Sequence, residues 1–445
     1  MSTRQWYADG RLTSQHRVPV DRIRHELGRA MDDLDYPTEP ASLRPVVLTE
    51  QAYDAIFQAG SRLLRLLRRT LMERADTPAG RIAALGADPD EYPLCIEGPL
   101  EDRFATCMSR PDVVIDADGP KFVEFNVGGG VGRVVDTTLA TSAWVTAFGG
   151  RDAAPFTTPD AMAVRDAFFL RTARELGVRP AVALVGTARD VRATTTRHFD
   201  LQVDSMRRSG LEAEFFEPEG LFQALHGNGE LSYPLGLRYF TVPEWRRLGI
   251  DLAEIRAALD AGCLLLATQT AYMIANKKVM GWLSEGRPWM TADDRALVER
   301  YLPWTRVVTD RKVEWRGRQW SLPALLLGER ERFVLKLGTG IKGEEVLIGR
   351  FCERAEWEAK VAEAVAGGDH IAQEFVETIP CRMEFADDSG PGSYEADVYP
   401  VFGPYIFDGR AGGLGVRYLP GGRQGIISVQ KYGALPSVAV RGRSA

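Results

Sequence analysis

The chain has 445 residues, 45% of them hydrophobic and 26% charged, which is an ordinary globular composition and enough chain for two or three domains. The formal net charge of -6 argues against a nucleic-acid or anionic-membrane surface. No apolar run approaches the ~20 residues of a membrane span, and no apolar signal core follows the first methionine. The five cysteines are scattered without a CxxC pair, so no disulfide framework or zinc site is indicated, and a reducing cytoplasm is expected.

The first third of the chain predicts an arm, a helix and a hairpin. The first 45 residues are polar, Arg-rich and interrupted by prolines, which favours an arm packed on the main body. Apolar residues recur at helical spacing from Gln51 to Arg74, which predicts an amphipathic packing helix. Val113–Ile115 and Lys121–Val127 are strand-like and are joined by DADGP, a tight connection typical of a hairpin.

The middle of the chain alternates helices with strands, and the last third does not. Helices are predicted at 162–176 and 199–208, and strands at 181–185, 212–216, 237–240 and 263–267. This alternation is typical of an α/β domain with a parallel sheet. The later elements indicate an α+β arrangement. They are hairpin strands within 333–349, a helix near 354–365, and strands near 371–376, 395–400 and 426–430.

Four polar residues alternate along the two strands of the first hairpin. Arg110 and Asp112 lie two residues apart on the outgoing strand, and Glu124 and Asn126 do so on the returning strand. Residues two apart on a strand share a face, so a register that aligns the two faces would bring all four side chains together. Oxygen ligands of this kind suit Mg²⁺, which takes one or two carboxylates together with substrate phosphates. An ordinary solvated strand face is the alternative.

A glycine-rich stretch, FVLKLGTGIKGEEVLIG, places Gly338, Gly340 and Gly343 in the G-x-G-x-x-G spacing of dinucleotide sites. Such a site needs a helix after the glycines, whereas the residues that follow, EEVLI, are typical of a short strand. The sequence therefore predicts a hairpin with the glycines at its turn. Backbone N–H groups of such a loop can approach phosphates closely, and Lys336 on the first strand can neutralise them.

Three further segments carry candidate contacts. Asn276 and Lys277 precede an apolar helix, and Lys277 is a second candidate phosphate lysine, with a surface lysine as the alternative. The segment 370–376 has the pattern of an edge strand, which can form the floor of an adenine pocket through backbone hydrogen bonds, with a half-buried strand as the alternative. The glycine run 128–133 is either an anion or substrate loop or a structural turn.

Together these segments resemble the circularly permuted branch of the ATP-grasp superfamily that includes glutathionylspermidine synthase-like carboxylate–amine ligases. The carboxylates precede the lysines in this chain, which is the order that permutation of the superfamily's standard order produces. The resemblance covers roughly residues 95–432. Five motifs carry it: R-x-D with E-x-N at 110–126, Asn276-Lys277, Lys336 with its three glycines, QEFV at 373–376, and a late glycine/arginine segment with Arg417.

The resemblance implies a role for each matching residue. Arg110 would be catalytic, by stabilising the γ-phosphoryl group during transfer. Two departures from the pattern are Leu337, where this branch usually has proline, and Arg417, which falls in a variable region. The implied Mg²⁺ ligands are Asp112, Glu124 and Asn126, and the implied ATP contacts are Lys277, Lys336, Gly338, Gly340, Gly343, Gln373, Glu374, Phe375 and Val376.

The implied fold class is mixed α/β and α+β, namely a circularly permuted ATP-grasp fold with an inserted parallel-sheet α/β substrate domain. The implied divisions are a helical arm with a packing helix at 1–95, a metal-binding hairpin at 96–150, the pre-ATP-grasp-like α/β domain at 151–270, and the lysine and glycine-loop lobe with the rest of the core at 271–445.

The implied activity is ATP-dependent ligation of a carboxylate to an amine, with release of ADP and phosphate. ATP and Mg²⁺ are the expected cofactors, a small carboxylate and a small amine are the expected partners, and neither nucleic acid nor membrane is expected. The oligomeric state stays open, with a homodimer as one option. A kinase-like phosphotransferase and a non-catalytic nucleotide-binding protein remain alternatives.

Overall fold

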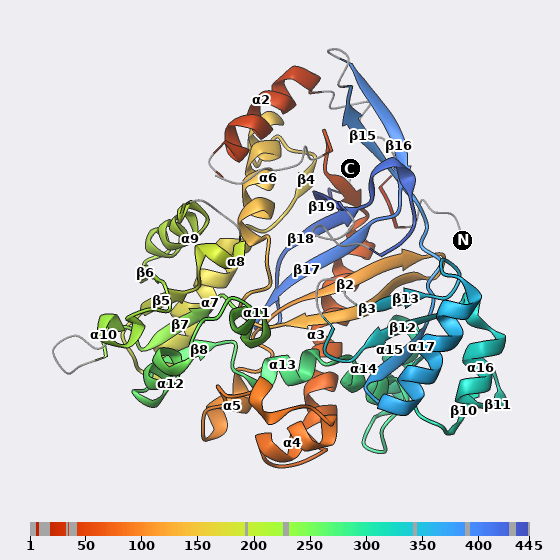
Figure 1. The fold of residues 1–445 in the computed structure, drawn as a ribbon. Coiled ribbons are helices and arrows are strands. Elements are labelled where there is room, and N and C mark those ends of the chain that lie inside the picture. The colour runs from red at the N-terminus through yellow and green to blue at the C-terminus, as the bar shows by residue number, and fades with distance from the viewer. Residues whose placement is uncertain are drawn as a thin grey trace.

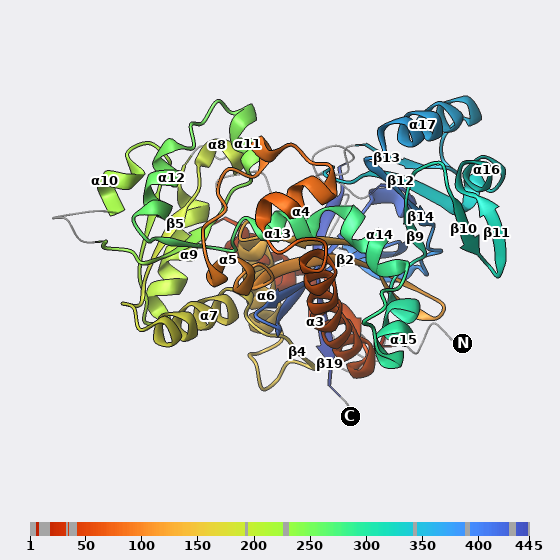
Figure 2. The ribbon, with the colours of Figure 1, turned by 90° about the horizontal axis from the view of Figure 1, so that it is seen from below.

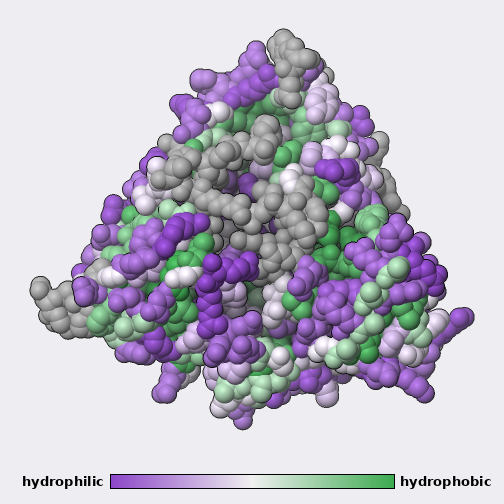
Figure 3. Space-filling view, in the orientation of Figure 1, coloured by the Kyte–Doolittle hydropathy of each residue, from purple (hydrophilic) through white to green (hydrophobic). Residues whose placement is uncertain are grey.

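The computed structural model describes residues 6–8, 18–32, 34, 42–191, 195–225, 231–340, 345–387, 392–426 and 433–443. Figure 1 shows a roughly triangular molecule, with a central sheet that leads to the helices at the top, an α/β unit at the lower left and a mixed lobe at the lower right. Seen from below, helix α3 lies between the two lower lobes (Figure 2). Hydrophilic residues dominate the outline of the face in Figure 1, and hydrophobic residues show as smaller patches (Figure 3).

The central sheet has seven strands, in the order β1-β19-β18-β17-β2-β3 with β4 beside β19. β1 is parallel to β19, and each pairing from β19 across to β3 is antiparallel. The first predicted hairpin is confirmed as β2 and β3, with strands longer than expected. The bounds are β1 Val46–Leu48, β2 Met108–Asp116, β3 Gly119–Val127, β4 Phe156–Thr157, β17 Val401–Phe407, β18 Arg410–Tyr418 and β19 Leu435–Gly442.

Helices cover both faces of the central sheet. The predicted packing helix is confirmed as α3 (Glu50–Met72), where Gly60 lets the helix approach the sheet so closely that an added Cβ would lie 2.8 Å from Ile406. On the opposite face lies α6 (Val134–Ala147), and α2 (Val20–Met31) packs on α6. The arm predicted for the first 45 residues therefore contributes one helix to this layer.

The α/β unit has four parallel strands in the order β6-β5-β7-β8. Alternate residues of β5 enter two different hydrophobic clusters, which places helices on both faces of the sheet. The predicted parallel sheet is confirmed, with β7 starting two residues before the predicted strand. The bounds are β5 Ala181–Val185, β6 Glu212–Phe216, β7 Leu235–Arg238, β8 Leu264–Leu266, α7 Ala161–Leu176, α8 Ala188–Val191, α9 Arg197–Arg208, α10 Leu221–Leu225, α11 Val242–Arg247 and α12 Ala253–Asp260.

The mixed lobe contains a four-stranded sheet in the order β13-β12-β14-β9. β12 is antiparallel to β13, so the glycine-rich stretch forms the predicted hairpin and not a strand–helix unit. The expected edge strand is wrong, because β14 pairs with β12 on one side and with β9 on the other. The bounds are β9 Thr305–Val307, β10 Lys312–Trp315, β11 Arg318–Ser321, β12 Phe333–Leu337, β13 Val346–Ile348, β14 His370–Glu374, α14 Lys277–Ser284, α15 Ala292–Tyr301, α16 Leu322–Gly328 and α17 Arg354–Gly367.

Smaller elements connect these parts. The strand expected near 395–400 is β16, which forms a hairpin with β15, and most of the strand expected at 426–430 lies outside the described residues. Among the described helices, none is long and apolar enough to cross a bilayer. The remaining bounds are β15 Cys381–Ala386, β16 Ser393–Val398, α4 Pro78–Leu85, α5 Pro99–Arg103, α13 Thr270–Ala275, and the 3₁₀ helices η2 Pro89–Glu91, η4 Arg330–Arg332 and η5 Pro420–Gly422.

Candidate functional site

The register of β2 and β3 brings the four polar residues of the hairpin onto one face. Arg110 is paired directly with Asn126, and Asp112 with Glu124. Directly opposed residues of an antiparallel pair project from the same side of the sheet. The convergence that the sequence left conditional on register is therefore present in the structure.

Asp112 is held in place from two sides. Arg417 Nη2 lies 2.6 Å from Asp112 Oδ1, and Asn126 Nδ2 donates to the same oxygen at 3.3 Å. Asn126 Nδ2 also donates to the Arg110 carbonyl at 3.1 Å. Because both hydrogen bonds use the amide nitrogen, the Asn126 amide oxygen remains available as a ligand atom.

Lys277 joins Glu124 to the glycine loop. Its Nζ lies 3.1 Å from Glu124 Oε1 and donates to the Gly340 carbonyl, while its backbone N–H donates to the Gly338 carbonyl. Asn276 fixes this position, since its side chain caps α14. The neighbouring Lys278 turns away and donates to the Leu85 carbonyl, so only the first lysine of the pair faces the cavities.

Lys336 projects from β12 toward the same region and is only 7% exposed. Its Nζ donates to the Val123 carbonyl at 2.9 Å and to Gln373 Oε1 at 2.8 Å. Burial lowers the pKa of the Lys336 ammonium to about 8, although the charge of Glu124 opposes the shift. The hydrogen-bond partners of the Lys336 ammonium are a carbonyl and an amide oxygen, both uncharged. An anionic ligand would therefore stabilise this buried positive charge.

The buried ammonium predicts a pH dependence of stability. The folded-state pKa of Lys336 lies below the unfolded value, so between about pH 8 and pH 10.5 the unfolded chain binds more protons and stability rises with pH. We expect the free energy of unfolding of the wild type, relative to Lys336→Met, to rise by about 2 kcal/mol across that window. Urea titrations of both proteins at each pH measure this difference, and a flat difference contradicts the placement.

These side chains line one cavity of about 500 Å³ between the central sheet and the β12–β14 sheet, here called the central cavity. Asp112 and Lys336, which are far apart in the sequence, line this one space. Its wall also includes apolar residues of β12 and β13. Of the predicted site residues, it is lined by Arg110, Asp112, Glu124, Asn126, Lys336, Gln373, Glu374, Phe375 and Val376.

The predicted adenine segment presents less free backbone than an edge strand would. The Glu374 N–H already donates to the Trp304 carbonyl and the Phe375 N–H to the Arg332 carbonyl. The Glu374 carboxylate pairs with Arg316 at 2.7 Å. A base at this end of the central cavity would therefore meet carbonyl groups, Val376 and the Phe375 side chain.

The remaining predicted residues line a second cavity of about 300 Å³, here called the loop-side cavity, which shares Glu124 and Asn126 with the central cavity. It is lined by Lys277, Gly338 and Gly340. Gly338 is required there, because an added Cβ would lie 2.8 Å from Asn276 Oδ1. Gly343 lies outside the described residues.

The structure supports the structural role of the glycine run 128–133, one of the two that the sequence left open. Gly129 is structural, since an added Cβ would lie 2.3 Å from the Arg238 carbonyl in the α/β unit. Arg133, at the end of the run, begins α6 in a left-handed conformation (φ 60°), and it borders the central cavity.

Two arginines of the candidate site, Arg417 and Arg133, had no role predicted from the sequence. Arg417, set aside as part of a variable region, pairs with Asp112 because β17 and β18 bring it back beside β2. Arg133 was seen only as the end of a glycine run. A strand predicted over 410–418 would have placed Gly415 and Arg417, which are two residues apart, on the same face of the sheet.

The two cavities together are lined by six cations and six carboxylates, but the charges nearest the Asp112–Glu124 pair are mostly positive. Four cations, from Arg110, Lys277, Lys336 and Arg417, surround the two carboxylates of Asp112 and Glu124. Burial, followed by the charge of Arg417, lowers the pKa of Arg110. This local excess of positive charge favours a ligand with several negative charges.

Comparison with solved structures supplies the class of fold. A glutathione synthetase like-effector from Globodera pallida, in its apoform, is 12% identical over 97% of this chain and 98% of its own, with a TM-score of 0.57. A putative gamma-glutamylcysteine synthetase from Methylobacillus flagellatus KT is 13% identical over 86% of each chain, with a TM-score of 0.40. No family model and no curated protein matches the chain. The fold is therefore a mixed α/β fold similar to that of a glutathione synthetase-like protein.

Proposed function

We propose that this protein is an ATP-dependent ligase that activates a carboxylate as an acyl phosphate and couples it to an amine, with release of ADP and phosphate. One observation carries the proposal: acidic side chains of β2 and β3 face the lysines of α14 and β12 across two adjoining cavities. The synthetase-like fold agrees with this activity, and we assign the fold to the circularly permuted ATP-grasp branch as part of the same proposal.

ATP would occupy the central and loop-side cavities together. The base would lie at the end formed by Phe375 and Val376, and the triphosphate would extend toward Lys336, Lys277 and the glycine loop. Lys277 and Glu124 are paired in the present structure. If a phosphate replaced Glu124 as the partner of the Lys277 ammonium, the Glu124 carboxylate could bind a cation instead.

The oxygen ligands at the junction of the two cavities fit Mg²⁺. The described part of the chain holds no cluster of three or more His, Cys, Asp or Glu side chains. Asp112, Glu124 and the amide oxygen of Asn126 form instead a partial ligand set, which is the kind that Mg²⁺ accepts when substrate phosphates complete its shell. When bound, Mg²⁺ would neutralise charge on the phosphates.

The chain's own residues would then perform two steps. A carboxylate oxygen attacks the γ-phosphorus and ADP leaves, while Arg110 and Lys336 stabilise the charge on the moving phosphoryl group. The amine then attacks the acyl carbon, phosphate leaves, and the nitrogen loses a proton. The hairpin of β12 and β13, with its glycines, would exclude water from the acyl phosphate.

A hydroxylamine trap tests the activity. With ATP, Mg²⁺, a panel of carboxylic acids and hydroxylamine, we expect hydroxamate to form in a 1:1 ratio to ADP. Cleavage of ATP to AMP would exclude the mechanism. A stable phosphorylated product without any need for an amine would favour the kinase-like alternative.

A further inference from the structure

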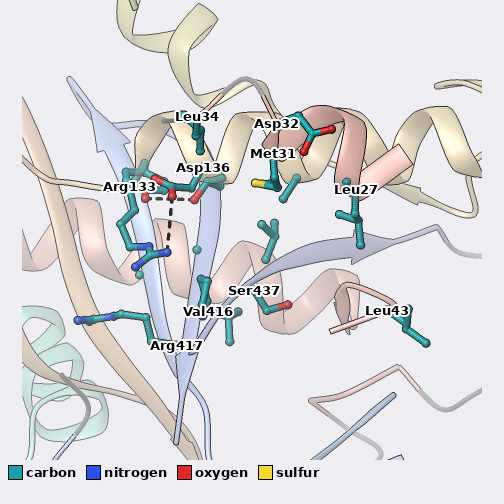
Figure 4. Close-up of a pocket in the computed structure, with 18 of the residues that line it drawn as sticks. Leu27, Met31, Asp32, Leu34, Leu43, Arg133, Asp136, Val416, Arg417 and Ser437 are labelled. Atoms are coloured by element: carbon teal, nitrogen blue, oxygen red, sulfur yellow. Dashed lines mark hydrogen bonds and ion pairs between the residues drawn. The ribbon is translucent and has the colours of Figure 1, made fainter. Parts of the chain in front are cut away.

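A third cavity, here called the helix-side cavity, lies beneath α2 on the same face of the central sheet and measures about 490 Å³. Arg110, Arg133 and Arg417 line both this cavity and the central cavity. The two spaces therefore meet at these arginines, of which Arg110 is the proposed contact of the γ-phosphoryl group. Figure 4 shows Arg133 and Arg417 at one end of the helix-side cavity and Leu27 and Met31 projecting into it from α2.

The body of the helix-side cavity is largely apolar, with Arg24 and Asp32 as further charged residues of its wall. Its polar wall groups are largely paired with one another: the Thr137 and Tyr405 hydroxyl oxygens are 3.2 Å apart, and those of Ser437 and Ser42 are 2.8 Å apart. Ligand groups beside them would find few free hydrogen-bonding partners. The apolar wall consists of Leu27, Met31, Leu34, Leu43, Ala140, Val416 and Val438.

The end of the helix-side cavity near β2 is cationic and lacks a full complement of anions. Arg417 is paired with Asp112, and Arg133 lies 3.6 Å from Asp136. Among the described residues Arg110 has no salt-bridge partner, and its Nη1 donates to the Gly132 carbonyl. Gly403 makes room for its side chain, since an added Cβ would lie 3.0 Å from Arg110 Cδ. A buried guanidinium beside a second guanidinium is stabilised by an incoming anion.

We propose that the helix-side cavity binds the acid substrate, and that this substrate is a monocarboxylic acid with an uncharged, apolar body. Its carboxylate would lie against Arg110 at the junction with the central cavity, and its body would extend beneath α2. This inference rests on the proposed function, since it assigns the acid of that same reaction. The pocket is of a size that accommodates small metabolites.

Binding can be measured without turnover. Isothermal titration in the presence of ADP and Mg²⁺ compares 3-phenylpropanoate with succinate, L-glutamate and 3-phenylpropanamide. We expect 3-phenylpropanoate to bind at least about tenfold more tightly than succinate or L-glutamate. The second carboxylate of each of these acids would lie against the apolar part of the cavity wall. The amide lacks the charge that Arg110 binds and should also lose about tenfold or more.

Two substitutions that fill the helix-side cavity locate this binding. Met31→Trp and, independently, Leu27→Trp should each weaken binding of 3-phenylpropanoate by at least about tenfold and leave ADP affinity unchanged. Arg29→Trp is the matched control, because Arg29 is on the exposed side of the same helix. Thermal unfolding of each variant verifies the fold.

The outcomes separate the two proposals. Tighter binding of succinate or glutamate, failure of 3-phenylpropanoate to bind, or unchanged binding in both tryptophan variants overturns the inference about the acid, even if other acids yield hydroxamate. Failure of the proposed function gives a different result: 3-phenylpropanoate binds in the helix-side cavity, but no acid yields hydroxamate and ADP.

Discussion

Asp112→Asn and Glu124→Gln are each expected to lower turnover by about a hundredfold or more and to leave the fold intact. Both substitutions keep the shape of the side chain and remove the charge that a Mg²⁺ ligand needs. Asp112→Asn also removes the carboxylate that Arg417 contacts, and Glu124→Gln removes the one that Lys277 contacts. ADP release under saturating ATP measures the loss, and circular dichroism with thermal unfolding verifies the fold.

Asp118→Asn is the matched control for both variants. Asp118 is exposed in the turn that joins the same two strands, so the substitution removes a carboxylate from the hairpin without entering the cavities. Turnover should stay at the wild-type level. Near-normal turnover in Asp112→Asn and Glu124→Gln would remove the metal assignment altogether.

Lys336→Met is expected to raise the KM for ATP and to lower kcat/KM by about a hundredfold or more. The methionine keeps an unbranched chain in a buried place but removes the one ammonium that lies between Val123 and Gln373. The folded state should persist, because the two lost hydrogen bonds are offset by the removal of a buried charge. Steady-state kinetics over a range of ATP concentrations measure the effect.

Lys312→Met is the control for the lysine variant, because Lys312 is exposed on β10 in the same lobe. It should leave the KM for ATP unchanged. An unchanged KM in Lys336→Met would show that the nucleotide does not meet β12, and the proposed orientation of ATP would then be wrong.

Local patterns predicted much of the site because the relevant residues lie on hairpins. Phe333 to Leu337 and the run after the glycines are short aliphatic segments typical of strands, and the structure pairs them as β12 and β13. The polar alternation along β2 and β3 likewise placed four side chains on two faces, and the register of the hairpin then joined those faces. In a hairpin the paired residues are close in the sequence, so local patterns identified the strands, although the register itself came from the structure.

Long-range pairings could not be predicted in the same way. β17 contains Gly403 and Pro404, and β18 has three glycines, so both strands have weak local preference and are stabilised by their neighbours in the sheet. The contact between Arg417 and Asp112 exists only because β17 inserts between β18 and β2. The edge strand predicted at 370–376 was wrong for the same reason, because the pairing of β14 with β9 joins residues that are far apart in the sequence.

The most direct test of the account is a crystal structure with a non-hydrolysable ATP analogue and Mg²⁺. We predict phosphates between the β2–β3 hairpin and the two lysines, with Asp112, Glu124 and Asn126 at the metal and Lys277 and Lys336 on the phosphates. A nucleotide bound elsewhere, for example at the β5–β8 sheet, with the lysines still paired as they are now, would contradict it.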